Sequence, residues 1–144
     1  MTKTKPETIY KWLAAGGRCA NGGTGTWYLP HGKRPGKWMP PIKGDLVACE
    51  NGYHGCRKSD LIHWIAAELY ELEYRGERLD ADNKIVVRQA RLLRRIETWN
   101  DRTARLFACD CAERALARLE KPDPRSVEAI RVARLFANGK ATAN

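Results

Sequence analysis

The segment CENGYHGC, Cys49 to Cys56, holds residue types that could do chemistry, because two cysteines and a histidine surround an Asn-Gly turn. Thiolates and imidazoles are the ligands of structural zinc, and a closed site needs four of them. His63 and the Cys109/Cys111 pair could contribute further ligands, but no CxxC spacing occurs. We therefore expect no bound metal, and reduced thiols rather than disulfides.

The histidine of this segment, His54, could instead act as a base for a Cys56 nucleophile. Side chains two residues apart on a strand share a face, so the geometry permits the pair. The simpler interpretation is a strand, a tight turn and a second short strand whose thiols pack inward. His54 is then either a core histidine or a pocket residue.

A second kind of chemistry is suggested by the charge distribution. The formal net charge is +9, and no Asp or Glu occurs from Thr8 to Gly44. Residues 30–44 form a Pro/Gly-rich arm that cannot be helical. We expect the arm to bind a polyanion, with cations on phosphates and an aromatic ring on bases. Its candidate binding residues are Lys33, Arg34, Lys37 and Trp38.

A later cluster of cations could extend that surface. It consists of Arg88, Arg91, Arg94 and Arg95. Residues 85–96 fit either a helix or a strand, and their β-branched start favours a strand. On a regular strand, Arg88 and Arg94 would face one way, and Arg91 and Arg95 the other.

The remaining pattern predicts the elements around these sites. Residues 45–50 read as a strand, Ser59 as the cap of a helix, and the alternation in 69–76 as a half-buried strand. Asn100 and Asp123 are expected to cap two helices.

Together these elements predict an α+β fold. We expect a small antiparallel sheet domain, residues 1–98, with a C-terminal αα-hairpin, residues 99–144, packed on it. No apolar run is long enough to cross a membrane, and the start of the chain lacks the apolar core of a secretory signal. We therefore expect a cytoplasmic protein.

Two segments resemble known families. GYHGC and the strands after it, residues 45–96, resemble an uncharacterised α+β domain of bacteriophage genomes with a Gly-aromatic-His-x-Cys turn. The segment RLFACDCAERALARLEKPDP and its continuation, residues 104–142, are similar to helical hairpins in predicted immunity proteins of polymorphic toxin systems. Both resemblances imply a phage or bacterial accessory protein, in the cytoplasm of a bacterial host.

An enzyme alternative comes from a further resemblance. ADP-ribosyltransferases grip NAD with a His or Arg, a Tyr or Ser, and a Glu on successive strands. His31, Tyr53 and Glu73 occur here in a compatible order. The resemblance implies NAD as the cofactor and these residues as the catalytic set.

The chain contains no Walker loop, no GxGxxG and no HExxH. We therefore expect a non-enzymatic binding module without a cofactor, whose partner is nucleic acid or an acidic host protein.

Overall fold

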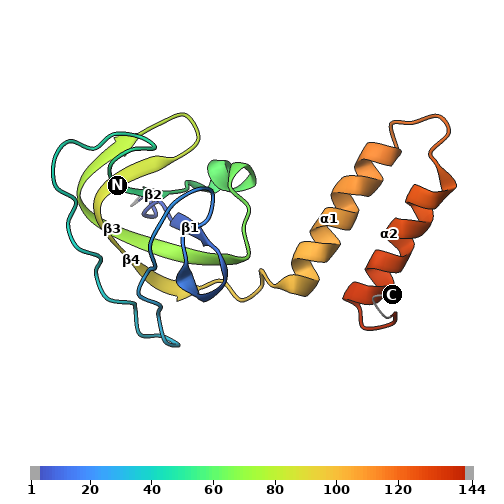
Figure 1. Cartoon of the computed structure of the whole chain (residues 1–144), viewed down its shortest axis with the longest axis horizontal. Coiled ribbons are helices and arrows are strands. Elements are labelled where there is room, and N and C mark those ends of the chain that lie inside the picture. The colour runs from blue at the N-terminus through green and yellow to red at the C-terminus, as the bar shows by residue number, and fades with distance from the viewer. Residues whose placement is uncertain (1–3, 142–144) are drawn as a thin grey trace. The chain divides into compact units, whose positions relative to one another are not determined.

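The computed structural model describes residues 4–141 of the chain. The chain divides into two compact units, Met1–Glu97 and Thr98–Asn144. The first contains a curled antiparallel sheet and the second contains two α-helices (Figure 1). The α+β class that the sequence predicts is confirmed.

The first unit is built on a long β-hairpin. β3 (Glu68–Asp80) pairs antiparallel with β4 (Ile85–Arg95). Leu72 of β3 is buried, while Glu71 and Glu73 beside it are only partly buried, as alternation requires. In β4 the β-branched start is fully buried, so the strand interpretation of this segment is right and the helix is wrong.

Two shorter strands complete the sheet in the order β1-β3-β4-β2. β1 (Ile9–Leu13) pairs with β3, and β2 (Tyr53–Gly55) pairs with β4. Tyr10 and Cys56 then exchange both backbone hydrogen bonds, each with an N–O distance of 2.8 Å. This pair links β1 to the end of β2, so the curled sheet closes on itself around its core.

The core is apolar and consists of side chains from both ends of the first unit. Its buried members are Ile9, Leu13, Trp27, Tyr70, Leu72, Ile85, Val87, Ala90 and Leu92. Trp27 precedes the arm and is 4% exposed, so most of its surface packs within the first unit.

The Pro/Gly-rich arm lies along the part of β4 that continues beyond its pairing with β2. Three of its amides donate to β4 carbonyls, as Gly36 to Leu92 (2.8 Å), Met39 to Ala90 (2.9 Å) and Ile42 to Arg88 (2.9 Å). A Cβ on Gly36 would lie 2.3 Å from the Tyr28 carbonyl oxygen, so the close approach requires glycine. The arm thereby covers a sheet edge that would otherwise be open.

The predicted strand over 45–50 is wrong. This segment is a turn in which Val47 and Asn51 exchange backbone hydrogen bonds of 2.9 Å. The Asn51 side-chain amide also donates to the Lys43 and Asp45 carbonyls, at 2.8 Å each. These local bonds compete with strand pairing, so the strand begins only after the turn.

The helix predicted after Ser59 is also wrong, because the segment is a short 3-10 helix, η2 (Lys58–His63). The buried Asp60 carboxylate accepts from the Arg57 amide (2.9 Å) and from its guanidinium (2.8 Å), which holds this tight turn. The predicted helix covered residues 60–69, and its last two residues, Glu68 and Leu69, belong to β3 instead, since sheet pairing outweighs local preference.

The second unit is an αα-hairpin. α1 (Asp101–Leu116) is capped by Asn100, whose side chain accepts from the Thr103 amide at 3.0 Å. α2 (Pro124–Ala137) is capped by Asp123. Both caps and both helices agree with the sequence prediction. None of the helices among the described residues has the length and apolar character needed to span a membrane.

Candidate functional site

The four arginines that the sequence offers as phosphate contacts are all paired with glutamates of β3. The pairs are Arg88–Glu77, Arg91–Glu73, Arg94–Glu71 and Arg95–Glu68. The Arg94 pair is bidentate, with both N–O distances 2.8 Å, and its hydrogen bonds lower the pKa of Glu71. We call this set the arginine ladder. Its positive charges are largely balanced by the glutamates of β3.

The register of the ladder differs from regular alternation. Glu71 and Glu73 are two residues apart on β3 and share a face, and they lie opposite Arg94 and Arg91. A bulge at this point adds Leu93 to β4, so Arg91 and Arg94 face the same way. The expected alternation, with these two arginines on opposite faces, is wrong.

Trp38 is held against the ladder. The guanidinium carbons of Arg75 and Arg91 lie 4.2 and 4.7 Å from its ring centroid. Arg75 in turn donates to the Gln89 side chain at 2.7 Å. Trp38 therefore serves to dock the arm by cation–π contacts.

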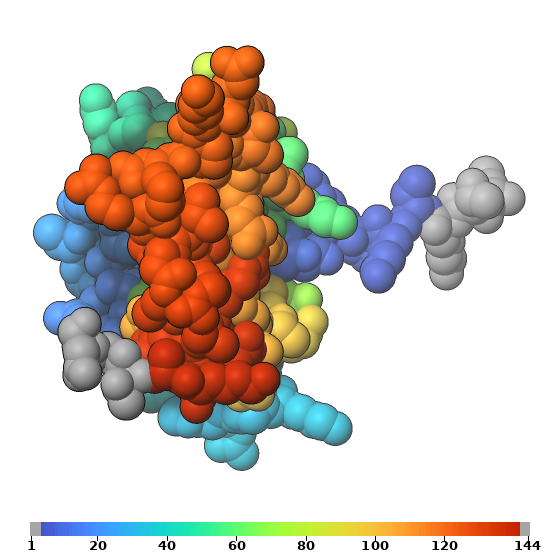
Figure 2. Space-filling model, turned by 90° about the vertical axis from the view of Figure 1, so that its right-hand side faces the viewer, coloured from blue at the N-terminus to red at the C-terminus, as the bar shows by residue number. Residues whose placement is uncertain are grey.

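The exposed cations of the arm lie at its tip. Arg34 and His31 exchange backbone hydrogen bonds of 2.9 and 3.0 Å, which folds 31–34 into a tight turn. Lys33 and Arg34 are exposed, and neither forms an ion pair with any residue in 4–141. Lys37 follows, 5.9 Å from the ring centroid of Tyr28. We call residues 31–37 the basic turn; the chain projects here in light blue at the lower edge (Figure 2).

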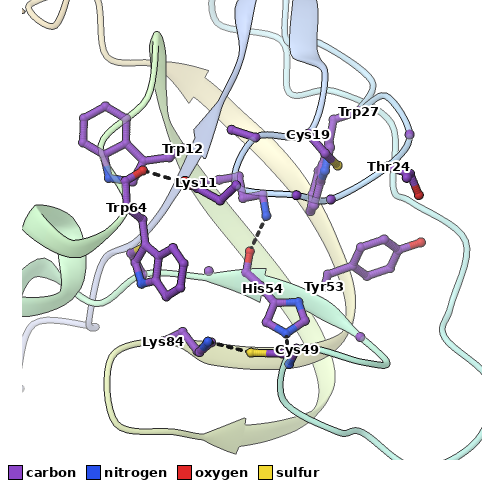
Figure 3. A pocket seen from close by; sticks show the side chains of 18 of the residues that line it. Lys11, Trp12, Cys19, Thr24, Trp27, Cys49, Tyr53, His54, Trp64 and Lys84 are labelled. Carbon is purple, nitrogen blue, oxygen red and sulfur yellow. Dashed lines mark hydrogen bonds between the residues drawn. The ribbon is translucent and has the colours of Figure 1, made fainter.

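A second region of cationic character is a cavity of about 590 Å³ in the first unit. Its walls come from β1, β2, the Gly-rich segment 19–26 and the connection before β4. Trp27, Tyr53 and Trp64 line it, and two lysines, Lys11 and Lys84, lie on either side of His54 (Figure 3). We call it the lysine pocket.

Lys11 occupies an unusual place for a lysine. It lies on β1 between Ile9 and Leu13, so alternation directs it to the core side of the strand. Its ammonium donates to the His54 carbonyl at 2.7 Å and lies 5.1 Å from the Trp27 ring centroid. Burial lowers the pKa of Lys11, against the opposing effect of the Cys19 and Cys56 thiols. No carboxylate among residues 4–141 pairs with it.

Lys84 holds the other side of the pocket. Its ammonium lies 2.8 Å from the Cys49 sulfur and 4.6 Å from the Trp64 ring centroid. The Trp64 indole donates to the Asn83 carbonyl at 2.8 Å, which fixes this aromatic wall. Like Lys11, Lys84 has no carboxylate partner in the described part of the chain.

His54 lines the pocket and is fixed by its neighbours. Its Nε2 accepts from the Cys49 amide at 2.8 Å, so that lone pair is already used. Burial, with the nearby Lys11 and Lys84 charges, lowers the pKa of His54. His54 is therefore a neutral, oriented imidazole at neutral pH.

The two thiols of this segment differ. Cys49 is exposed in a left-handed conformation (φ 67°), so the expectation that both thiols pack inward is wrong for it. Cys56 is buried, and burial raises the pKa of its thiol to about 11. A protonated, buried thiol is a poor nucleophile. Among residues 4–141, no three His, Cys, Asp or Glu side chains cluster as metal ligands would.

The three residues of the enzyme alternative lie in different surroundings. Tyr53 lines the pocket and donates to the Pro40 carbonyl at 2.6 Å. His31 belongs to the exposed basic turn, and Glu73 is paired with Arg91 at 2.7 Å. Neither His31 nor Glu73 is part of the pocket lining.

No family model, curated protein or solved structure matches this chain. The resemblances of 45–96 and 104–142 therefore stay predictions.

Sequence reasoning missed the two pocket lysines as a site. One signal existed, because Lys11 shares a strand face with Ile9 and Leu13. Burying a lysine on a core face costs free energy unless a partner or ligand compensates its charge. Lys84 carried no such signal. Its place in the pocket depends on the β3–β4 connection bringing it beside Cys49, which lies far away in sequence.

Proposed function

We propose that this chain is a non-enzymatic nucleic-acid-binding module that contacts phosphates through its basic turn. The observation that carries the proposal is that Lys33, Arg34 and Lys37 are exposed and have no carboxylate partner within residues 4–141. Free ammonium and guanidinium groups gain the most from phosphate contact, because binding releases counterions from the strand.

The aromatic beside these cations supports nucleic acid over an acidic protein. Tyr28 is 49% exposed and lies under Lys37, so a base can stack next to a phosphate contact. The arginine ladder contributes less, because each of its guanidiniums already has a carboxylate partner.

The origin proposed for the module is a phage or mobile element, acting in the cytoplasm of a bacterial host. This part depends only on the resemblances of 45–96 and 104–142. No observation favours the ADP-ribosyltransferase alternative, since Glu73 is engaged with Arg91.

The test is binding of labelled single-stranded DNA and RNA as salt rises. We expect affinity to fall steeply with salt, and the double variant Lys33→Glu/Arg34→Glu to lose most of it. The matched control is Lys58→Glu/Lys121→Glu, which makes the same change in net charge at two other exposed lysines.

Equal loss in both double variants would reduce the effect to net charge and contradict a local contact. Binding to neither nucleic acid at low salt, with capture of an acidic protein through the same turn, would replace nucleic acid with a protein partner.

A further inference from the structure

We infer that the lysine pocket binds a mononucleotide-class ligand, meaning a planar aromatic base joined to a phosphate. The inference depends on the pocket alone and does not need the basic turn to bind nucleic acid. The ligand can be a free nucleotide or the phosphorylated end of a strand.

The charge of the pocket favours an anionic ligand. Two ammonium groups, those of Lys11 and Lys84, face it without a carboxylate partner in residues 4–141. Glu50 is the acidic residue of the lining; it lies on the exposed turn and pairs with neither lysine. A buried ammonium without a counterion is costly, and a bound phosphate would supply that counterion.

The aromatic walls of the pocket favour a ligand with a planar ring. Trp27 and Tyr53 meet edge to face, with ring centroids 5.2 Å apart, and Trp64 forms part of the lining. Each lysine lies over one of the tryptophans, so cation and aromatic surface are adjacent twice. A ligand that carries its negative charge next to a ring fits this arrangement better than a simple anion does.

The Gly-rich segment 19–26 adds polar groups at the rim. The Asn21 side chain donates to the Trp64 carbonyl at 3.3 Å, which connects the segment to the aromatic wall. The backbone amides of Gly22 and Thr24 donate to no group among the described residues, and both residues line the cavity. Such amides are suitable donors to phosphate oxygens.

The size of the cavity agrees with this ligand. A volume of about 590 Å³ lies within the range of small-molecule sites, which is roughly 300–1,000 Å³. An inorganic phosphate would leave most of it empty.

The experiment is calorimetric titration of the full chain with AMP, UMP, adenosine and inorganic phosphate. We expect both monophosphates to bind at least about tenfold more tightly than the nucleoside or phosphate alone, because each half uses one part of the pocket. A 5′-phosphorylated oligonucleotide and its 5′-hydroxyl counterpart distinguish a strand end from a free nucleotide as the source.

The decisive variant is Lys84→Met, which removes one ammonium at a partly exposed position. We expect it to weaken monophosphate binding by about tenfold or more while adenosine binding changes little. The control is Lys43→Met, at an exposed lysine outside the pocket lining, which should leave both unchanged. Far-UV circular dichroism verifies the fold of each variant.

Three results would overturn the inference. They are no monophosphate binding at millimolar concentration, phosphate binding as tightly as AMP, and equal losses in Lys84→Met and Lys43→Met. None of these depends on the basic turn. Conversely, loss of strand binding in Lys33→Glu/Arg34→Glu with AMP binding retained would separate the two sites.

Discussion

The arginine ladder and the lysine pocket are both positively charged, but they differ in whether their cations have carboxylate partners. The ladder places its cations on an open strand surface, and every one has a glutamate partner across the hairpin. The pocket places two cations in a partly enclosed cavity, and neither has a carboxylate partner among residues 4–141. The difference separates cations whose charge is already balanced by a glutamate from cations that are available to a ligand.

Removing the ladder's carboxylates should make its arginines available. We expect Glu71→Gln/Glu73→Gln/Glu77→Gln to raise low-salt affinity for single-stranded nucleic acid more than tenfold. The plot of log affinity against log salt should steepen by about 2, since three released cations each add about 0.7. Filter binding across salt concentrations measures both.

The control for this triple variant is Asp45→Asn/Asp82→Asn/Glu120→Gln, which changes net charge equally at exposed acids without ion pairs among the described residues. An equal gain in nucleic-acid affinity in the control would show that the glutamate pairs do not keep the ladder arginines from binding.

In the pocket, removing a buried charge should not lower the free energy of unfolding. At pH 7 we expect Lys11→Met to unfold with a free energy equal to or above that of the wild type, because burial disfavours the Lys11 ammonium. The lowered pKa means that the unfolded chain holds more protons just below pH 10.5. The wild type should therefore gain stability from Lys11 as pH rises through that window, and the variant should not.

Urea denaturation at several pH values measures this. A fall of more than about 2 kcal/mol at pH 7 would mean that the hydrogen bond to the His54 carbonyl outweighs the cost of burying the charge.

A smaller effect concerns Cys56, whose thiol pKa is raised by burial to about 11 from 9.0. A raised pKa means that the contribution of the neutral thiol is complete below pH 9 and is lost as pH rises toward 11. Between pH 9 and 10 this amounts to about 1 kcal/mol of unfolding free energy. We expect Cys56→Ala to lose stability less steeply over that interval, and identical slopes would contradict a buried, protonated thiol.

Much of the fold could be predicted from the sequence. Alternation in 69–76 and β-branched residues after Asn83 indicated the hairpin, and Asn100 and Asp123 indicated both helix starts. The failures lie where side chains satisfy the backbone locally. Asn51 closes the 45–50 turn, and Asp60 tightens η2, so neither segment follows its propensity.

The site was less predictable, for a different reason. Exposure of the basic turn follows from its Pro/Gly composition, and His54 was a pocket candidate from the sequence. Pairing in the ladder depends on a bulge that no local pattern marks, and the pocket depends on Lys84 meeting Cys49 across the fold. Long-range register decided both.

The most direct test of the account compares two double variants in one salt titration with single-stranded RNA and DNA. For Lys33→Ala/Arg34→Ala, we expect the slope of log affinity against log salt to become shallower by about 1.4, the loss of two phosphate contacts. For Arg91→Ala/Arg94→Ala, we expect the slope of the wild type. An equal reduction of the slope in both variants, or a reduction in the arginine variant alone, would contradict the claim that unpaired cations make the contacts.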